Sequence, residues 1–214
     1  MCGRYRRTAS EEELARLYHI PIPSQTDLPI SYNIAPSQKV LAIRSNPKSQ
    51  QRSLDAVQWG LIPYWAKDPK VAYRTINARA ETVDKAPSFR QAFAKRRCLI
   101  PADGFYEWRK TARPKLPFAI AMKDGRPFTF AGLWEGWKDP ESGEWLHTCT
   151  IITGEPNELV TDPSPYAGDS SRATSRSLVR GNGERKLKGV AGPLACRPDA
   201  DVGNFSAGKQ PRQQ

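Results

Sequence analysis

The chain has 214 residues, 38% of them hydrophobic and six of them Trp, which is enough for one globular domain with a substantial core. It has no apolar run of about 18 residues and no signal-peptide pattern, so we expect a cytoplasmic protein with no membrane association. The four cysteines form no C-x-x-C pair and there are only two histidines, so we predict no metal site, no other cofactor and no disulfides.

The net charge of +11 favours a polyanionic partner, of which nucleic acid is the commonest. Up to Val160 the chain holds 24 basic and 17 acidic residues, and after it 9 and 5. The larger share of the positive charge therefore belongs to the part of the chain that we expect to fold.

The local patterns predict few helices and many strands. Residues 8–18 should form a short helix, because Ser10 and Glu13 have capping-box spacing and Leu14, Leu17 and Tyr18 repeat at helical intervals. A second helix is expected over 87–97. Strands are expected over 39–44, 54–60, 98–101, 105–109, 117–122, 128–134 and 145–153, with a two-residue hairpin turn at Asp124-Gly125. The fold class is therefore α+β, a β-rich domain of antiparallel hairpins or a partly closed barrel with a few short helices.

The character of the sequence changes after Val160. Every Trp precedes this point, whereas 161–214 is rich in Ser, Arg, Gly and Pro without sustained periodicity. We therefore predict a folded domain over 2–160 and a disordered basic tail over 161–214.

The chain begins MCGRY, and removal of Met1 would leave Cys2 with a free α-amine and a thiol on neighbouring carbons. The amine ordinarily titrates near pH 7.7–8.0 and the thiol near 8.5, so we expect a reactive fraction of both at neutral pH. Such a 1,2-aminothiol is well suited to trap an aldehyde.

Five segments mix rigid aromatic or proline residues with a few polar groups: MCGRY, SYNIAP (31–36), WGLIPYW (59–65), INARAET (76–82) and IPADGFYEW (100–108). In this order they resemble the SOS response-associated peptidase family, also described as abasic-site processing proteins. The resemblance covers residues 2 to about 160. It implies a protein that binds single-stranded DNA at abasic sites and links to the opened sugar through Cys2 as a thiazolidine, shielding the lesion.

The resemblance also implies roles for individual residues. Asn77 would orient the N-terminal amine, and Glu107 would shuttle protons as the catalytic carboxylate. Arg4 and Arg79 would contact phosphates beside the lesion, and Trp65 would stack on or wedge against a base, although a core position is equally compatible with its sequence. Asn33 falls in a matching motif and is grouped with the DNA-binding residues, although taken singly it is typical of a turn.

One family element is missing, a histidine in a segment resembling I-H-x-R-M-P-V-I-L-P. Residues 161–171 read TDPSPYAGDSS. Read one base later, codons for these residues can spell Gln-Ile-His-Arg-Arg-Met-Pro-Val-Ile-Leu-Pro, with the histidine at the slot of Pro163. We infer a slip of the reading frame near Val160, and therefore an impaired activity of this chain.

Two other function classes stay open. A non-covalent module for single-stranded nucleic acid would use the same basic, aromatic surface without needing Cys2. A cysteine-type (auto)peptidase would need a base near the thiol, for which the sequence offers His19 and His147, and AP-lyase-like activity is a further expectation. We expect a monomer, and the sequence identifies no protein partner at the replication fork.

Overall fold

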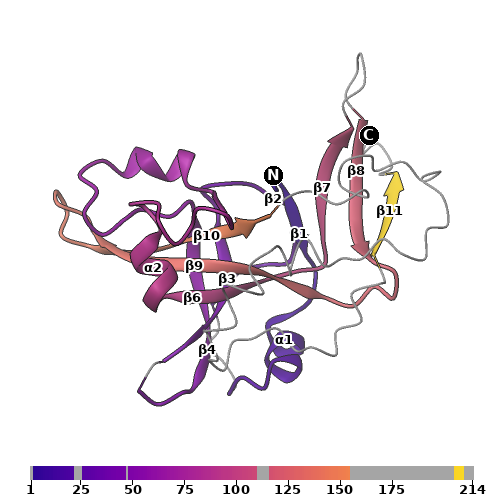
Figure 1. Cartoon of the computed structure of the whole chain (residues 1–214). Helices are drawn as coiled ribbons and strands as arrows, with labels where there is room; N and C mark the ends of the chain where they lie inside the picture. The colour runs from indigo at the N-terminus through magenta and orange to yellow at the C-terminus, as the bar shows by residue number, and fades with distance from the viewer. Residues whose placement is uncertain (1, 22–25, 47, 110–115, 155–204, 210–214) are drawn as a thin grey trace.

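The computed structural model describes residues 2–21, 26–46, 48–109, 116–154 and 205–209. Its centre is a closed barrel (Figure 1) of five strands: β3 (Lys39–Ser45), β4 (Arg52–Trp59), β6 (Arg97–Ala102), β9 (Phe128–Lys138) and β10 (Trp145–Thr153). Antiparallel ladders run in the order β4-β3-β6-β9-β10. The ring closes where β10 returns to β4 in parallel, with Thr148 opposite Gln58 and Cys149 opposite Trp59.

A second, antiparallel sheet stands beside the barrel, with β7, β8 and β11 at the right of Figure 1. Its order is β11 (Phe205–Lys209), β8 (Leu116–Met122), β7 (Gly104–Arg109), β1 (Tyr5–Arg7) and β2 (Ser31–Ile34). Strands β6 and β7 follow each other in the chain with only Asp103 between them, so one segment joins barrel and sheet. A short strand, β5 (Asn77–Arg79), adds to β10 in parallel outside the ring.

The main core fills the barrel. Because side chains alternate along each strand, one face of every barrel strand points inward, and a five-stranded barrel is narrow enough for side chains to fill it. The inward residues include Val40, Ala42, Val57, Trp59, Cys98, Ile100, Phe130, Cys149 and Ile151. Tyr5 and Phe105 from the second sheet complete this cluster, so barrel and sheet share one core.

The helices are short, as predicted. Helix α1 (Glu11–Leu17) begins at Ser10, whose hydroxyl accepts a hydrogen bond from the Glu13 amide, and it buries Leu14 and Ala15 against β3 and β4. Helix α2 (Arg90–Lys95) is shorter than the predicted 87–97, because Pro87 to Phe89 form a turn and Arg97 begins β6. The 3-10 helix η1 (Pro69–Arg74) is capped by Asp68.

The hairpin predicted at Asp124-Gly125 is wrong. A turn does form there, with Gly125 at φ +72° and its amide donating to the Met122 carbonyl. The strands that it joins, however, lie in different sheets, since β8 pairs with β7 and β11, whereas β9 pairs with β6 and β10. Pro127 follows the turn and has no N–H to continue a ladder between them.

The prediction of a disordered, frame-shifted tail concerns residues 161–214, which lie outside the described residues except for β11. Strand β11 pairs with β8 from Phe205 opposite Met122 to Lys209 opposite Phe118. The tail prediction stays a prediction. Within the described residues, no helix is long and apolar enough to cross a membrane.

Candidate functional site

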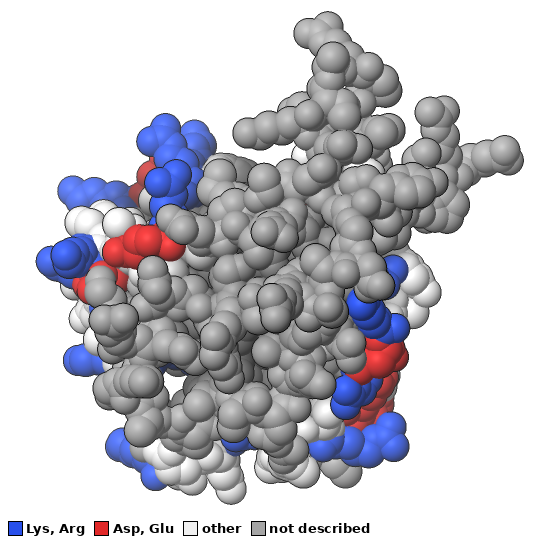
Figure 2. Space-filling view, turned by 45° about the vertical axis from the view of Figure 1, so that its right-hand side comes forward, with Lys and Arg blue, Asp and Glu red and all other residues white. Residues whose placement is uncertain are grey.

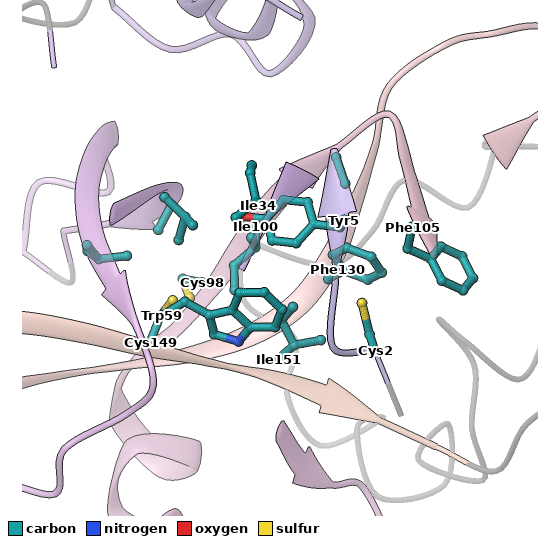
Figure 3. Packing of buried hydrophobic residues seen from close by; sticks show 14 of the residues in the cluster. Cys2, Tyr5, Ile34, Trp59, Cys98, Ile100, Phe105, Phe130, Cys149 and Ile151 are labelled. Atoms are coloured by element: carbon teal, nitrogen blue, oxygen red, sulfur yellow. The ribbon is translucent and has the colours of Figure 1, made fainter. Parts of the chain in front are cut away.

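Cys2 lies just ahead of β1, with only 6% of its surface exposed. Its thiol donates to the carbonyl oxygen of Arg4 over 3.7 Å. Figure 3 shows Cys2 at the edge of the core cluster near Phe130, while the sulfur atoms of Cys98 and Cys149 lie together beside Trp59. The N-terminal thiol is therefore held where barrel and sheet meet, apart from the other two described cysteines.

Asn77 is brought to Cys2 by the parallel pairing of β5 with β10, in which Asn77 stands opposite Ile151. The indole N–H of Trp59 donates to the Ile76 carbonyl over 2.8 Å and so fixes the approach to β5. The Asn77 side-chain N–H donates to the Cys2 carbonyl over 2.7 Å. Its amide oxygen is buried and has no hydrogen-bond partner, although buried polar atoms normally have one.

Glu107 on β7 is the third predicted catalytic residue, and its charge affects the pKa of the Cys2 thiol. Burial raises the pKa of Glu107, while the chain's N-terminal ammonium group and the Trp108 backbone oppose this increase. The pKa of the Cys2 thiol is raised to about 12, first by burial and second by the negative charge of Glu107. Cys2, Asn77 and Glu107, from three separate segments of the chain, therefore belong to one site.

The raised thiol pKa corrects one sequence-based expectation. The ordinary value near 8.5 predicted a usable thiolate fraction at neutral pH. Burial raises the thiol pKa to about 12, so the thiol is protonated at neutral pH. The expectation was wrong because the sequence does not reveal how completely position 2 is removed from water. Deprotonation of this thiol at neutral pH therefore requires a proton acceptor.

Two residues that sequence reasoning missed hold the N-terminal segment in place. One carboxylate oxygen of Asp103, 7% exposed, accepts hydrogen bonds from the Thr8 amide, from the Thr8 hydroxyl (2.9 Å) and from the Ala9 amide (3.1 Å). The buried Arg7 guanidinium donates to the carbonyls of Ala9, Leu28 and Pro29 over 2.7, 3.0 and 2.5 Å. A signal was available, since Asp103 lies inside IPADGFYEW and Arg7 two residues after MCGRY.

The predicted DNA-binding residues are partly or fully exposed. Arg4 donates to the Asn33 side-chain oxygen over 2.9 Å, so these two residues form a pair at the surface. Arg79 ends β5 and is exposed, two residues beyond Asn77. Trp65 is 52% exposed, whereas Trp59 is 1% exposed, so the ambiguity over Trp65 resolves toward the surface.

Neither histidine is among the groups that perturb the Cys2 thiol. His19 follows α1 at φ +52°, the left-handed position that often ends a helix. His147 packs edge-on against Trp134, with ring centroids 5.8 Å apart, in a cluster with Arg44 and Asp55. Burial and the Arg44 charge lower the pKa of His147. Within the described part of the chain, no group of His, Cys, Asp and Glu could hold a metal ion.

Basic side chains are spread widely over the molecule. Figure 2 shows Lys and Arg at several places around the margin of one face, with fewer Asp and Glu among them. This distribution agrees with the net charge of +11.

Comparison with known proteins identifies relatives of the chain. The family model described as SOS response associated peptidase (SRAP) matches residues 1–162. Abasic site processing protein YoqW of Bacillus subtilis is 47% identical over 165 residues, which cover 76% of this chain and 72% of that protein. Abasic site processing protein YedK of Escherichia coli is 31% identical over 192 residues, which cover 85% of this chain and 82% of that protein.

A eukaryotic relative and a solved structure extend this picture. Abasic site processing protein HMCES of Xenopus tropicalis is 32% identical, covering 69% of this chain and 53% of that protein. A crystal structure of a protein from Bacteroides thetaiotaomicron has a TM-score of 0.73 and 25% identity, covering 96% of this chain and 90% of that one.

Proposed function

The chain belongs to the SOS response associated peptidase family, and on this basis we propose that it crosslinks to abasic sites in single-stranded DNA. The reactive group is Cys2, made N-terminal by removal of Met1. Its α-amine and thiol together trap the aldehyde of the opened sugar as a thiazolidine and so shield the lesion.

The observation that carries this proposal is the contact between Asn77 and Cys2. The Asn77 amide donates to the Cys2 carbonyl over 2.7 Å, and its oxygen is buried without a partner. An orphaned acceptor beside the first peptide unit suits the N–H of the mature α-amine, which would satisfy it. A neutral amide orients the amine without supplying a proton, so the nitrogen lone pair stays available to the aldehyde.

The first covalent step uses the amine. Its nitrogen attacks the aldehyde carbon, a proton moves from nitrogen to oxygen, and water leaves to give a Schiff base. Glu107 has a raised pKa and lies beside the thiol, so it is the residue to protonate the departing hydroxyl. Loss of the hydroxyl without this proton would be slow.

The second step closes the ring. Loss of water leaves a protonated Schiff base and a Glu107 carboxylate; the Cys2 sulfur then attacks the same carbon, and the C=N bond becomes C–N while the ring nitrogen keeps its proton. Because the thiol pKa is about 12, the thiol proton needs an acceptor, and the Glu107 carboxylate takes it and so returns to its acid form. The closed ring resists hydrolysis better than an open imine.

The surface residues bind the strand. Arg4 and Arg79 bind phosphates flanking the lesion, and Trp65 stacks on a neighbouring base. Asn33 holds the Arg4 guanidinium through the 2.9 Å hydrogen bond and leaves its remaining donors for phosphate oxygens.

We also infer that this chain is impaired, because the family histidine expected at the slot of Pro163 is absent. The family match ends at residue 162, close to the inferred frame slip after Val160, which supports the inference. A non-covalent binding module is less well supported, since it leaves the Asn77 contact unexplained. A cysteine peptidase is also less well supported, since neither His19 nor His147 perturbs the thiol.

The test is the intact mass of the purified chain, alone and after incubation with an abasic oligonucleotide. We expect loss of Met1 and a denaturation-resistant adduct whose mass equals protein plus oligonucleotide minus one water. Cys2→Ala should abolish this adduct, whereas Cys98→Ala, which removes a thiol buried elsewhere in the core, should retain it. Equal adduct yields from Cys2→Ala and the parent chain would refute the proposal.

A further inference from the structure

Trp59 contacts both of the segments that carry the amine-bearing residue and its amide partner. It ends β4 and is 1% exposed. Its ring meets the Tyr5 ring edge-on, with centroids 5.3 Å apart, and its indole N–H donates to the Ile76 carbonyl over 2.8 Å. Tyr5 lies three residues after Cys2, and Ile76 directly precedes Asn77. One buried side chain, seen beside Tyr5 in Figure 3, therefore connects β1 with the start of β5.

Strand β5 benefits from such a contact because it is short and paired along one edge. It has three residues, and among the described strands it pairs only with β10. The Ile151 amide of β10 donates to the Ile76 carbonyl over 3.1 Å at the start of this ladder. A strand held along one edge can still turn about that edge. The Trp59 indole reaches the same carbonyl from the barrel core, so it restrains β5 from a second direction.

The backbone of Trp59 is itself held in place. Its amide donates to the Gln38 carbonyl over 2.9 Å, and its carbonyl accepts from the Ser37 amide over 2.8 Å. It also stands opposite Cys149 in the ladder that closes the barrel. The ring is packed in the main core, where side chains have little room to change rotamer. Trp59 therefore offers Ile76 a fixed hydrogen-bond donor.

The position of Ile76 matters because Asn77 follows it. The Asn77 amide donates to the Cys2 carbonyl over 2.7 Å, and its oxygen is buried without a partner. In the proposed mechanism this oxygen accepts from the α-amine. A misplacement of about 1 Å can cost about 100-fold in rate. A turn of β5 that moves the Asn77 amide would therefore slow the amine step while every reacting group is still present.

We propose that Trp59 is a positioning residue, which fixes Asn77 against the N-terminal aminothiol through its contacts with Ile76 and Tyr5. This inference rests on the proposed function, because it assumes that the α-amine of Cys2 reacts with the abasic sugar. It assigns a role in the chemical step to a core residue that acts through its neighbours. Loss of the indole N–H should therefore slow adduct formation without changing the affinity for DNA.

The experiment measures the rate of adduct formation by the full chain over a series of concentrations of abasic oligonucleotide. Trp59→Phe removes the indole N–H and keeps an aromatic ring. It should lower the saturated rate about 10-fold and leave the half-saturating concentration unchanged. The matched control is Trp137→Phe. Trp137 is 3% exposed, and its indole donates to the Ala66 carbonyl over 2.7 Å in the connection between β4 and β5. This control should keep the saturated rate of the parent chain, because its hydrogen bond does not adjoin Asn77.

A second replacement separates the hydrogen bond from the packing. Benzothienylalanine has sulfur in place of the indole N–H and nearly the same shape, so at position 59 it keeps the core filled even where Trp59→Phe fails to fold. It should lower the saturated rate by a similar factor. Hydrogen exchange gives a structural readout of the same variant. The Ala80 amide, which donates to the Thr153 carbonyl over 2.9 Å just after β5, should exchange faster, whereas the amides of β6 should exchange as in the parent chain.

The possible results separate this inference from the proposed function. If the parent chain forms no adduct with any abasic oligonucleotide, the proposed function fails and the role of Trp59 fails with it. If the parent chain forms adduct and benzothienylalanine at position 59 reacts at the parent rate, Trp59 does not position Asn77. The same conclusion follows if Trp59→Phe slows the saturated rate no more than Trp137→Phe does. A slower reaction that comes only from a higher half-saturating concentration also overturns the proposal, because positioning acts on the chemical step.

Discussion

Removal of the Asp103 carboxylate should destabilise the fold and slow crosslinking together. One oxygen of this side chain accepts from the Thr8 amide, the Thr8 hydroxyl and the Ala9 amide. These bonds tie the chain after β1 to the connection between β6 and β7. Cys2 lies on the other side of β1, so a loosened strand also loosens the reactive N-terminus.

The size of the effect follows from the donors left behind. Asp103→Ala leaves the buried Ala9 amide and the partly buried Thr8 amide without this acceptor. A buried unsatisfied donor costs about 1–3 kcal/mol, so we expect a loss of about 2–4 kcal/mol in the free energy of unfolding. For a folded part of this size that corresponds to a Tm lower by about 5–15 °C. Asp103→Asn keeps an acceptor oxygen but loses the charge, so its Tm should lie between those of the parent chain and Asp103→Ala.

Thermal unfolding and the rate of adduct formation would be measured on the same preparations. The control is Asp139→Ala in the β9–β10 turn, where an exposed carboxylate likewise accepts from two backbone amides, of Glu141 and Ser142 over 2.8 and 3.4 Å. Its effect should be much smaller, because water can replace the lost acceptor. A Tm for Asp103→Ala within 2 °C of that for Asp139→Ala would show that the Asp103 contacts do not stabilise β1.

Three further predictions concern protonation and the tail. Burial raises the pKa of Glu107, so ionisation of this carboxyl lowers the stability of the fold as the pH rises through the folded pKa. Glu107→Gln should therefore raise Tm at about pH 7.5 and slow adduct formation. A Tm no higher than that of the parent chain would contradict this. The pKa of His147 is lowered, so its protonation below the unfolded value of about 6.5 favours the unfolded chain. His147→Gln should flatten the loss of stability between about pH 8 and 5, and urea midpoints that fall in parallel with the parent's would argue against it. Re-encoding the chain after Val160 to restore Ile-His-x-Arg-Met-Pro should speed adduct formation and raise Tm, and equal rates and unfolding in the two chains would remove the functional weight of the inferred frame slip.

The sequence predicted local structure well because the signals are local. The Ser10 cap and the apolar spacing after it place α1 correctly, and the predicted strand over 145–153 coincides with β10. Closure of the barrel could not be predicted as precisely as the helices and strands. It depends on the parallel pairing of Cys149 with Trp59, ninety residues apart in the chain, and no local pattern encodes such a contact. The short strands β1, β2 and β5 were missed for the same reason.

For the candidate site, too, the sequence predicted the residues but not their environments. Cys2, Asn77 and Glu107 were identified from motifs, and the structure brings Asn77 to the Cys2 carbonyl and Glu107 to the Cys2 thiol. Motifs do not report burial, so the thiol pKa was misjudged, and Trp59 and Trp65, in one motif, took opposite environments. Asp103 escaped notice because an acidic residue before a glycine is typical of an exposed turn, and only the fold shows that its carboxylate is buried.

Burial of the Cys2 thiol has a consequence for how the protein survives before it meets damaged DNA. Because burial raises the pKa of the Cys2 thiol to about 12, little of it is thiolate at pH 7. Peroxides, alkylating agents and soft metal ions all react through the thiolate, so each finds this sulfur almost inert. On the proposed mechanism each molecule reacts once, so this group must stay intact until then. On that mechanism the amine reacts with the lesion first, and the sulfur reacts only after the aldehyde has been captured beside it.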